Sequence, residues 1–309
     1  MLLFSALNMS EAVTTGHIPL PLRALRQVPT CSGPALVVGL RTPSTEHHGP
    51  SAGSPGPAMS WAPGAAERAL AALLSEREAD GARDATVVLR VGTEGDLGWL
   101  AGAISWLAGH GRRAIVRTPR VLPRAVAEAA RRDGAAVHLQ VASFDPAMQR
   151  ALLGANADAP ARLLLSAQHL RAQTVPVSVL VGPLLPVVHA DASLSSVCRH
   201  IAAADLRDVS FGVGRWSARR HASVTSLLPS GGATALARVF QIFEPEATEG
   251  SVALPPREAS LLHRQACRVA QDAGLRVDHC GCTMHCHAQP ATAQPYRGLL
   301  ASDLFAGVG

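Results

Sequence analysis

The cysteines near the end of the chain are the residues best suited to chemistry. Three of the six cysteines in this 309-residue sequence, Cys280, Cys282 and Cys286, form a C-x-C-x3-C pattern. Three histidines are interleaved with them: His279, His285 and His287. A mixed Cys/His set suits zinc, whereas three thiolates that leave one iron open suit a [4Fe–4S] cluster. The pattern predicts a metal-binding tail, with a redox-active tail as the alternative.

The remaining cysteines and the chain start indicate where the protein works. Cys31, Cys198 and Cys267 are isolated, and the last two fall in predicted helices, where we expect buried small side chains. Clustered cysteines are more typical of a reducing compartment than of a disulfide framework. The start, MLLFSALNMSEAV, lacks the basic segment of a signal peptide, and no apolar segment is long enough to span a bilayer. We therefore expect a cytoplasmic protein with no membrane contact.

The composition allows a large core and contact with polyanions. Hydrophobic residues make up 48% of the chain and aromatic residues 4%, so we expect a core of Ala, Val and Leu. All 28 basic residues are arginines and the net charge is +5, which makes nucleic acid a candidate partner. The sequence contains no GxxxxGK[ST] phosphate loop, no GxSxG elbow and no HExxH motif, so it does not indicate the enzyme classes that these motifs mark.

Apolar runs alternate with segments of helical period. The runs predict strands at residues 35–40, 86–91, 112–117, 137–142, 175–181 and 208–214, with a further short strand at 275–278. The segments of helical period predict helices at residues 65–78, 97–111, 122–134, 160–173, 191–204, 233–243 and 257–273. Asp145-Pro146 predicts another helix start, and Asp191 or Ser193 is expected to cap the helix that follows it. Right-handed crossovers would place the strands side by side and parallel.

The pattern divides the chain into three segments. Residues 1–64 are expected to form an irregular arm, a first strand and a Pro/Gly-rich loop. The α/β barrel takes residues 65–250, and a C-terminal helix with the Cys/His-rich tail takes residues 251–309. Prolines at positions 19, 21 and 29 are the reason for expecting no regular structure before the first strand.

Ligands of parallel α/β proteins bind beyond the carboxyl ends of the strands. The residues at those ends are Gly92, Thr93, Glu94, Asp96, Arg117, Thr118, Ser143, Asp145, Gly182, Pro183, Gly212, Gly214 and Arg215. Carboxylates, hydroxyls and guanidinium groups together could hold a polar cofactor. Each residue also has a structural explanation, since Asp145 is a helix cap and glycines form turns.

Three stretches of this region carry a family resemblance. They are LRVGTEGD (residues 89–96), RRAIVRTPRVLPR (residues 112–124) and the long block from VHLQVASFDP to VLVGPLLPVV (residues 137–188). In order and character they resemble the radical SAM superfamily, in the branch of spore photoproduct lyase and its DNA-repair-photolyase-like relatives. The resemblance covers about two fifths of the chain and implies a partial (β/α)6 TIM-like barrel with parallel strands.

The resemblance also implies a cofactor and its contacts. S-adenosylmethionine would lie across the strand ends, with Thr93 and Glu94 near its methionine end and Ser143 and Pro183 near its ribose and adenine. The family cleaves this cofactor reductively at a [4Fe–4S] cluster, so an active member would be a lyase-like iron–sulfur enzyme.

The chain departs from the family in its cluster motif. Members carry CxxxCxxC in the loop after the first strand, but residues 41–64 contain no cysteine. In one interpretation, Cys280, Cys282 and Cys286 supply the cluster from the C-terminus. In the other, the barrel is degenerate and non-catalytic, with a zinc-binding or redox tail. A third hypothesis is an unrelated α/β enzyme that binds a phosphorylated small molecule at the strand ends.

Overall fold

The fold is built around one curved sheet. The computed structural model describes residues 22–30, 33–40, 64–79, 86–92, 97–213, 216–245 and 251–277. Within these residues the sheet has eight strands in the order β1-β2-β3-β4-β5-β6-β7-β11. Their bounds are β1 Leu22–Thr30, β2 Gly33–Leu40, β3 Thr86–Arg90, β4 Arg113–Thr118, β5 Ala136–Val141, β6 Val177–Leu184, β7 Asp208–Val213 and β11 Arg276–Val277.

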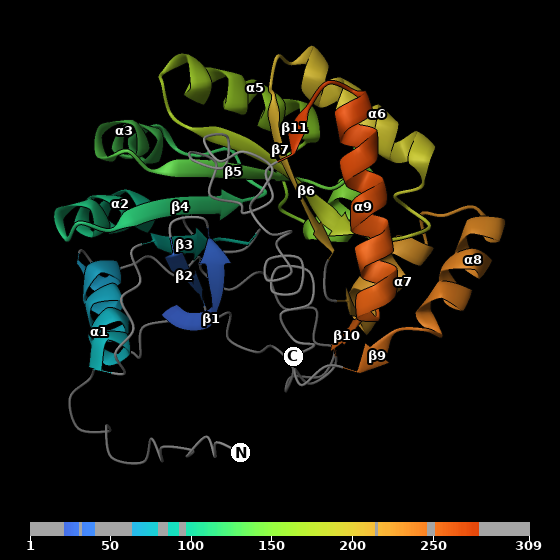
Figure 1. Cartoon of the computed structure of the whole chain (residues 1–309), viewed down its shortest axis with the longest axis horizontal. Helices are drawn as coiled ribbons and strands as arrows, with labels where there is room; N and C mark the ends of the chain where they lie inside the picture. The colour runs from blue at the N-terminus through green and yellow to red at the C-terminus, as the bar shows by residue number, and fades with distance from the viewer. Residues whose placement is uncertain are drawn as a thin grey trace, which may run out of the picture.

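The sheet is parallel from β2 to β11, and the strands β2 to β7 follow one another in chain order. This sequential order is the arrangement that successive right-handed βα units produce. Helices follow the strands and lie on the outer, convex side of the sheet (Figure 1). The prediction of an α/β fold with six consecutive parallel strands is confirmed. Between the described edge strands β1 and β11 there is no pairing, so the sheet is not closed.

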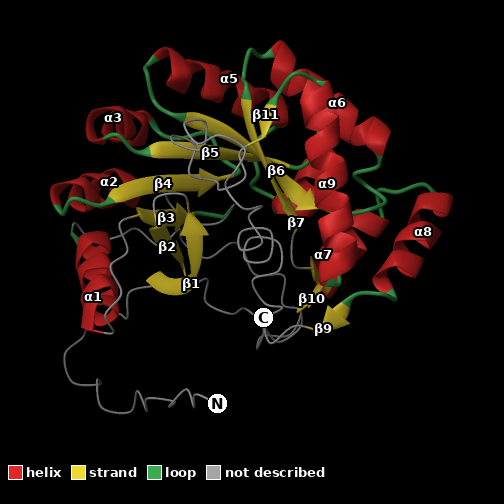
Figure 2. Cartoon of the chain, in the orientation of Figure 1, coloured by secondary structure: helices red, strands yellow, loops and turns green. Residues whose placement is uncertain are grey.

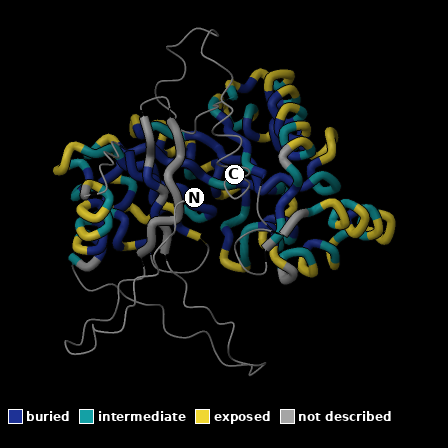
Figure 3. Tube along the Cα trace, turned by 60° about the horizontal axis from the view of Figure 1, so that its bottom comes forward, coloured by how far each residue is buried: buried dark blue, intermediate teal, exposed yellow. Residues whose placement is uncertain are grey.

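Six helices cover the outer face of the sheet. They are α1 Ala65–Ala79, α2 Trp99–Gly109, α3 Arg124–Asp133, α5 Pro160–Ala172, α6 Asp191–Ala203 and α9 Pro256–Asp272. One continuous core joins their apolar sides to alternate strand residues such as Val137, Leu139 and Val141 (Figure 3). Cys198 on α6 and Cys267 on α9 are part of this core, as expected. None of the described helices is long and apolar enough to cross a bilayer.

The expectation of an irregular segment before the first strand was wrong for residues 22–30, which form β1. This strand pairs antiparallel with β2 at the edge of the sheet, where Pro29 lies opposite Pro34. Proline lacks the N–H that an interior strand needs, but an edge strand has one side without a partner and tolerates it. Prolines that argue against a central strand therefore do not argue against an edge strand.

A second, smaller layer lies beside the end of the main sheet (Figure 2). It contains a three-stranded sheet in the order β8-β10-β9 and the helices α4, α7 and α8. Their bounds are α4 Pro146–Leu153, β8 Trp216–Ser217, α7 Ala218–Thr225, α8 Ser230–Phe240, β9 Glu244–Pro245 and β10 Ser251–Ala253. Trp216 is fully buried here with Met148 and Leu236. The sequence predicted α8 in part but not the small sheet, whose strands are too short to show a period.

Candidate functional site

The carboxyl ends of β5 and β6 bring two predicted site residues to the same level. Val141 pairs with Val181 in parallel register, and Ser143 and Pro183 each lie two residues further along. Ser143 is half-buried, whereas Pro183 is buried. Ser143 is therefore the one of the two that can present its side chain to a ligand, while Pro183 shapes the edge.

Gln149 on α4 fixes the backbone that carries Ser143. Its side chain is fully buried. Its Oε1 accepts hydrogen bonds from the backbone N–H groups of Ala142 at 2.7 Å and Ser143 at 3.1 Å. Its Nε2 donates to the carbonyl of Gln140 at 3.4 Å. We call residues 140–143, at the end of β5, the rim. A buried amide that bonds the backbone groups of the rim holds it in one conformation.

The Ser143 hydroxyl lies at the start of α4. Its Oγ accepts a hydrogen bond from the N–H of Asp145 at 3.1 Å. The carboxylate of Asp145 accepts from the N–H of Ala147 at 2.8 Å, which confirms Asp145 as the cap of α4. Because Oγ acts as an acceptor in this contact, the Ser143 hydroxyl proton can be donated to a ligand. At α6, by contrast, neither Asp191 nor Ser193 is the cap; Ala190 occupies that position.

His189 completes the rim by joining the segments that follow β5 and β6. Its Nδ1 accepts from the N–H of Leu185 at 2.9 Å, and its Nε2 lies 2.8 Å from the carbonyl of Ala142, to which it donates. Burial lowers the pKa of His189, while its contacts with the carbonyls of Ala142 and Leu185 act in the opposite direction. The ring is therefore neutral, with its proton on Nε2.

The backbones of β6 and β7 approach each other closely at the same level. The amide of Gln140 donates to the carbonyl of Gly182 at 2.9 Å. Gly182 has φ +147°, and a Cβ built on it would lie 2.3 Å from the carbonyl oxygen of Gly212. A side chain cannot fit there, so Gly182 has a specific reason to be glycine.

Several predicted site residues lie outside the described residues. They are Thr93 and Glu94 after β3, Gly214 and Arg215 after β7, and Cys280, Cys282 and Cys286 in the tail. The described residues include Gly92 and the ends of β3 and β7. The roles of the residues outside them stay predictions.

The inner face of the sheet carries a set of polar residues that we call the lumen set: Arg117, His138, Ser178 and Ser210. Arg117 on β4 pairs with His138 on β5, and His138 pairs with Ser178 on β6. Ser210 on β7 pairs with Leu180, one inward-facing position further toward the carboxyl end. All four are buried, and all lie on the face opposite the helices, since their strand neighbours form the outer core.

The lumen set includes polar atoms that have no hydrogen-bond partner. These are both ring nitrogens of His138 and the hydroxyls of Ser178 and Ser210. Burial, and then the charge of nearby Arg117, lower the pKa of His138 well below its ordinary value of 6.5. His138 is thus a neutral ring that offers one donor and one acceptor to the interior of the barrel.

Sequence reasoning considered only the strand ends and so missed His138, Ser178 and Ser210. The signal was present in the strands, because VHLQV and VSVLV each place a polar residue at alternate positions among apolar ones. A strand buried on both faces reads as nearly continuous apolar sequence. Polar residues at paired positions of adjacent strands interrupt this apolar sequence, and they indicate an inner face that is polar.

The described residues offer no site for a metal or an iron–sulfur cluster. No group of three or more His, Cys, Asp or Glu side chains is placed among them to hold a metal. Burial raises the pKa of Cys198 to about 11 and that of Cys267 to about 12, so both remain protonated thiols. Cluster ligands must be thiolates. The described part of the chain therefore does not fit a cluster.

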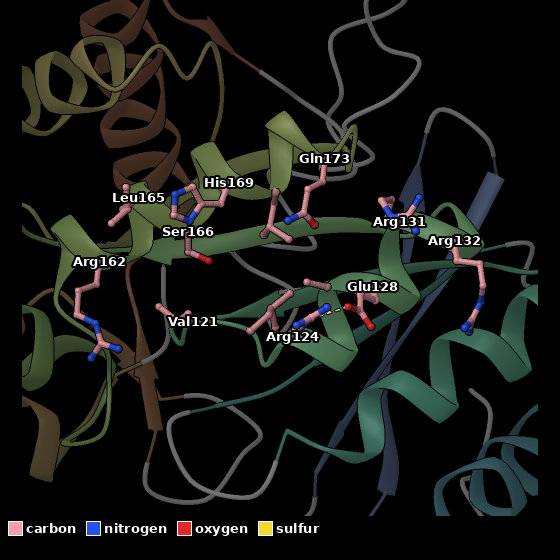
Figure 4. Close-up of a pocket in the computed structure, with 13 residues that line it drawn as sticks. Val121, Arg124, Glu128, Arg131, Arg132, Arg162, Leu165, Ser166, His169 and Gln173 are labelled. Atoms are coloured by element: carbon pink, nitrogen blue, oxygen red, sulfur yellow. Dashed lines mark hydrogen bonds and ion pairs between the residues drawn. The ribbon is translucent and has the colours of Figure 1, made fainter.

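A polar hollow of about 770 Å³ lies between α3 and α5 on the outer surface (Figure 4). Four arginines line it. Arg124, Arg132 and Arg162 are in ion pairs with Glu128, Asp133 and Asp158 respectively, and the fourth is Arg131. Arg124 is 92% exposed. Exposed pairs of this kind are well solvated without a ligand, so the hollow is a weaker candidate than the rim or the lumen set.

Comparisons with known proteins give matches in structure alone. No family model matches the sequence, and no curated protein matches it. A cysteine-to-serine variant of spore photoproduct lyase matches with a TM-score of 0.49 and 13% identity over 67% of this chain and 66% of that chain. The lyase complexed with dinucleoside spore photoproduct matches with a TM-score of 0.47 and 12% identity, over 66% of this chain and 64% of that one.

A more distant match is SuiB from Streptococcus suis, with a TM-score of 0.36, 8% identity and coverage of 45% of this chain and 31% of that chain. This chain thus spans 64% of the lyase complexed with dinucleoside spore photoproduct, slightly less than two thirds of its length. Spore photoproduct lyase, which the sequence resembles, is among the solved structures to which the computed structure is similar.

Proposed function

We propose that this radical-SAM-like protein binds S-adenosylmethionine across the carboxyl ends of β3, β5 and β6. Thr93 and Glu94 would lie near its methionine end, and Ser143 and Pro183 near its ribose and adenine. The proposal rests mainly on one observation: Ser143 and Pro183 both lie two residues beyond the paired residues Val141 and Val181 of adjacent parallel strands. It is supported by the available proton of the Ser143 hydroxyl, which suits a ribose oxygen, and by the sequence resemblance.

The rim makes such a site rigid before the ligand arrives. Gln149 and His189 satisfy the backbone groups on either side of Ser143. A binding residue that is already held in place loses little conformational freedom when it binds. The affinity is therefore expected to depend on contacts made by Ser143 rather than on reordering of the loop.

Isothermal titration of S-adenosylmethionine into the purified chain tests this part of the proposal. Ser143→Ala removes one hydrogen bond and is expected to weaken binding roughly fivefold to tenfold. Ser226→Ala, at the end of α7, is the matched control and should bind as the wild type does. Absence of binding to the wild-type chain, or equal affinity of Ser143→Ala, would contradict the proposed site.

We further propose that Cys280, Cys282 and Cys286 provide the thiolates of a [4Fe–4S] cluster. When bound, such a cluster supplies the electron for reductive cleavage of S-adenosylmethionine. The proposal is supported by the C-x-C-x3-C spacing and by the absence of cysteine from residues 41–64. Anaerobic reconstitution should give an iron–sulfur absorbance band that is lost when all three cysteines become alanine. The band should persist in Cys31→Ala, and colourless wild-type protein would refute the cluster.

The second candidate function is a non-catalytic barrel with a zinc-binding tail. It is favoured by His279, His285 and His287, which alternate with the cysteines. Metal analysis of protein purified without reconstitution separates the two: zinc without sulfide supports this candidate, whereas iron with sulfide supports the cluster. Nucleic acid as a substrate, and a cytoplasmic location, remain proposals on charge and sequence pattern.

A further inference from the structure

The lumen set presents unpartnered polar groups in one place. His138 and Ser178 lie directly opposite each other on adjacent strands, and Ser210 is displaced by one inward position on the next strand. His138 has no exposed surface, Ser178 is 1% exposed and Ser210 is 6% exposed. Four of their side-chain atoms have no hydrogen-bond partner among the described residues: Nδ1 and Nε2 of His138, and Oγ of Ser178 and of Ser210.

Polar atoms buried without partners are costly. Each unsatisfied group costs roughly 1–3 kcal/mol, and nearly all such groups in native proteins are paired with protein, water or ligand. Next to the set, Gln140, Gln149 and His189 follow the rule, since all three are bonded. Among the described residues, Trp216 Nε1 and His221 Nε2 in the second layer also have no partner, but these are not gathered on adjacent strands as the four atoms of the lumen set are. The lumen set is therefore more easily explained as half of a binding site than as poor packing.

The chemistry of the set selects the ligand. Arg117 lies close enough to act electrostatically on His138, so the set has positive charge beside it. The two hydroxyls and one ring nitrogen can donate to an anionic oxygen, but the second nitrogen of neutral His138 needs a donor. A phosphate group, with a second pKa of about 6, carries both anionic oxygens and an O–H near pH 6. A carboxylate offers acceptors alone.

Two glycines lie above the set toward the carboxyl end of the barrel. Gly92 and Gly212 occupy inward-facing positions above Arg90 and Ser210, because alternate residues of a strand share a face. A Cβ built on Gly92 would meet no atom within 4 Å, and one built on Gly212 would meet only the Leu180 Cδ1, at 3.7 Å. These two positions, at the end of the barrel that we call its mouth, therefore place no side chain above the lumen set.

We propose that the lumen binds the phosphate group of a small phosphorylated ligand through His138, Ser178 and Ser210, with Arg117 supplying the favourable charge. This site goes beyond the proposed function, since it lies below the rim and does not require S-adenosylmethionine.

The test uses the full chain and inorganic phosphate as the probe. Thermal unfolding is followed at pH 6.5 in phosphate, acetate and chloride at equal ionic strength, and phosphate affinity is measured by calorimetry. Phosphate should raise the midpoint above that in chloride and acetate. Ser178→Ala and Ser210→Ala should each weaken phosphate binding roughly fivefold, whereas Ser105→Ala on α2, a half-buried serine far from the lumen, should bind phosphate as the wild type does.

Two results would overturn the proposal. In one, phosphate stabilises the wild-type chain no more than chloride or acetate does. In the other, Ser178→Ala and Ser210→Ala respond to phosphate as strongly as the wild type, which would assign the effect to surface arginines. Titration of S-adenosylmethionine is read separately. A chain that responds to phosphate but binds no S-adenosylmethionine refutes the proposed function alone, and the reverse result refutes the lumen site alone.

Discussion

Two buried histidines in the same barrel differ in the hydrogen bonds that their ring nitrogens make. His189 at the rim is bonded at both nitrogens, to the N–H of Leu185 and the carbonyl of Ala142. His138 in the lumen is bonded at neither. Both rings are fully enclosed, so burial alone does not distinguish them. The difference indicates that the rim is complete by itself, whereas the lumen is complete only with something bound.

The largest effect is expected where the rim is broken. Gln149→Leu keeps the volume of the side chain but leaves the backbone N–H groups of Ala142 and Ser143 without an acceptor. Two buried donors without partners should lower the free energy of unfolding by roughly 2–4 kcal/mol. Urea denaturation of the wild type and the variant measures this loss.

Gln168→Leu is the matched control for that substitution. Gln168 lies on the exposed side of α5 and donates to the carbonyl of Ala204 at 2.9 Å. Water can replace this bond, so the variant should lose less than about 1 kcal/mol. If Gln149→Leu lowered the free energy of unfolding no more than Gln168→Leu does, the hydrogen bonds of Gln149 would not stabilise the rim. The contrast between a fully bonded rim and an unpartnered lumen set would then be lost.

Acid should destabilise both histidine sites. The pKa values of His138 and His189 are lowered in the folded protein, so the unfolded chain binds more protons below the ordinary value of 6.5. The stability contributed by the neutral rings is present above pH 6.5 and is lost as the pH falls below it. Each histidine can contribute at most about 1.4 kcal/mol per pH unit, and the loss should extend to lower pH for His138, whose pKa is lowered well below its ordinary value.

Urea denaturation between pH 7 and pH 5 checks this slope. His138→Gln and His189→Gln should each reduce it. An unchanged slope in His138→Gln would mean that His138 is not held neutral.

The smallest effects are expected from serine substitutions without phosphate. Ser178→Ala and Ser210→Ala remove hydroxyls that have no partner, so stability should stay the same or rise slightly. Ser105→Ala removes a hydroxyl that bonds Asp133 at 2.7 Å and the carbonyl of Ala101 at 3.0 Å, and should cost about 1 kcal/mol. A loss in Ser178→Ala as large as that in Ser105→Ala would show that the lumen hydroxyl is structural.

The sequence predicted the strands of the barrel well because each of them has a simple physical signature. Buried parallel strands such as β6 are short apolar runs, and Asp145-Pro146 marks a helix start by local chemistry alone. The sequence also indicated that Ser143 and Pro183 follow the ends of two strands, and the register of β5 and β6 places them at the same level. β1 was missed because its prolines argue against a strand until the strand is known to lie at an edge.

Other features depend on contacts that no local pattern contains. Gln149 lies on a helix and His189 follows a strand, and nothing in their neighbours indicates that both will bond the end of β5. His138, Ser178 and Ser210 come from three strands, and their shared face is defined only by the register between those strands. The residues at the strand ends could thus be predicted from sequence, while the side chains that fix these ends or share the inner face could not.

The two glycines at β6 and β7 offer unequal opportunities for engineering. No side chain can be added at Gly182, because its Cβ would collide with the backbone of Gly212, but one can be added at Gly212, where the nearest atom is at ordinary contact distance. Replacing Gly212 by alanine and then by valine would narrow the mouth of the barrel in steps. Substitution of Gly212 can therefore change the size of the opening in steps, while Gly182 keeps the backbones of β6 and β7 at the same separation.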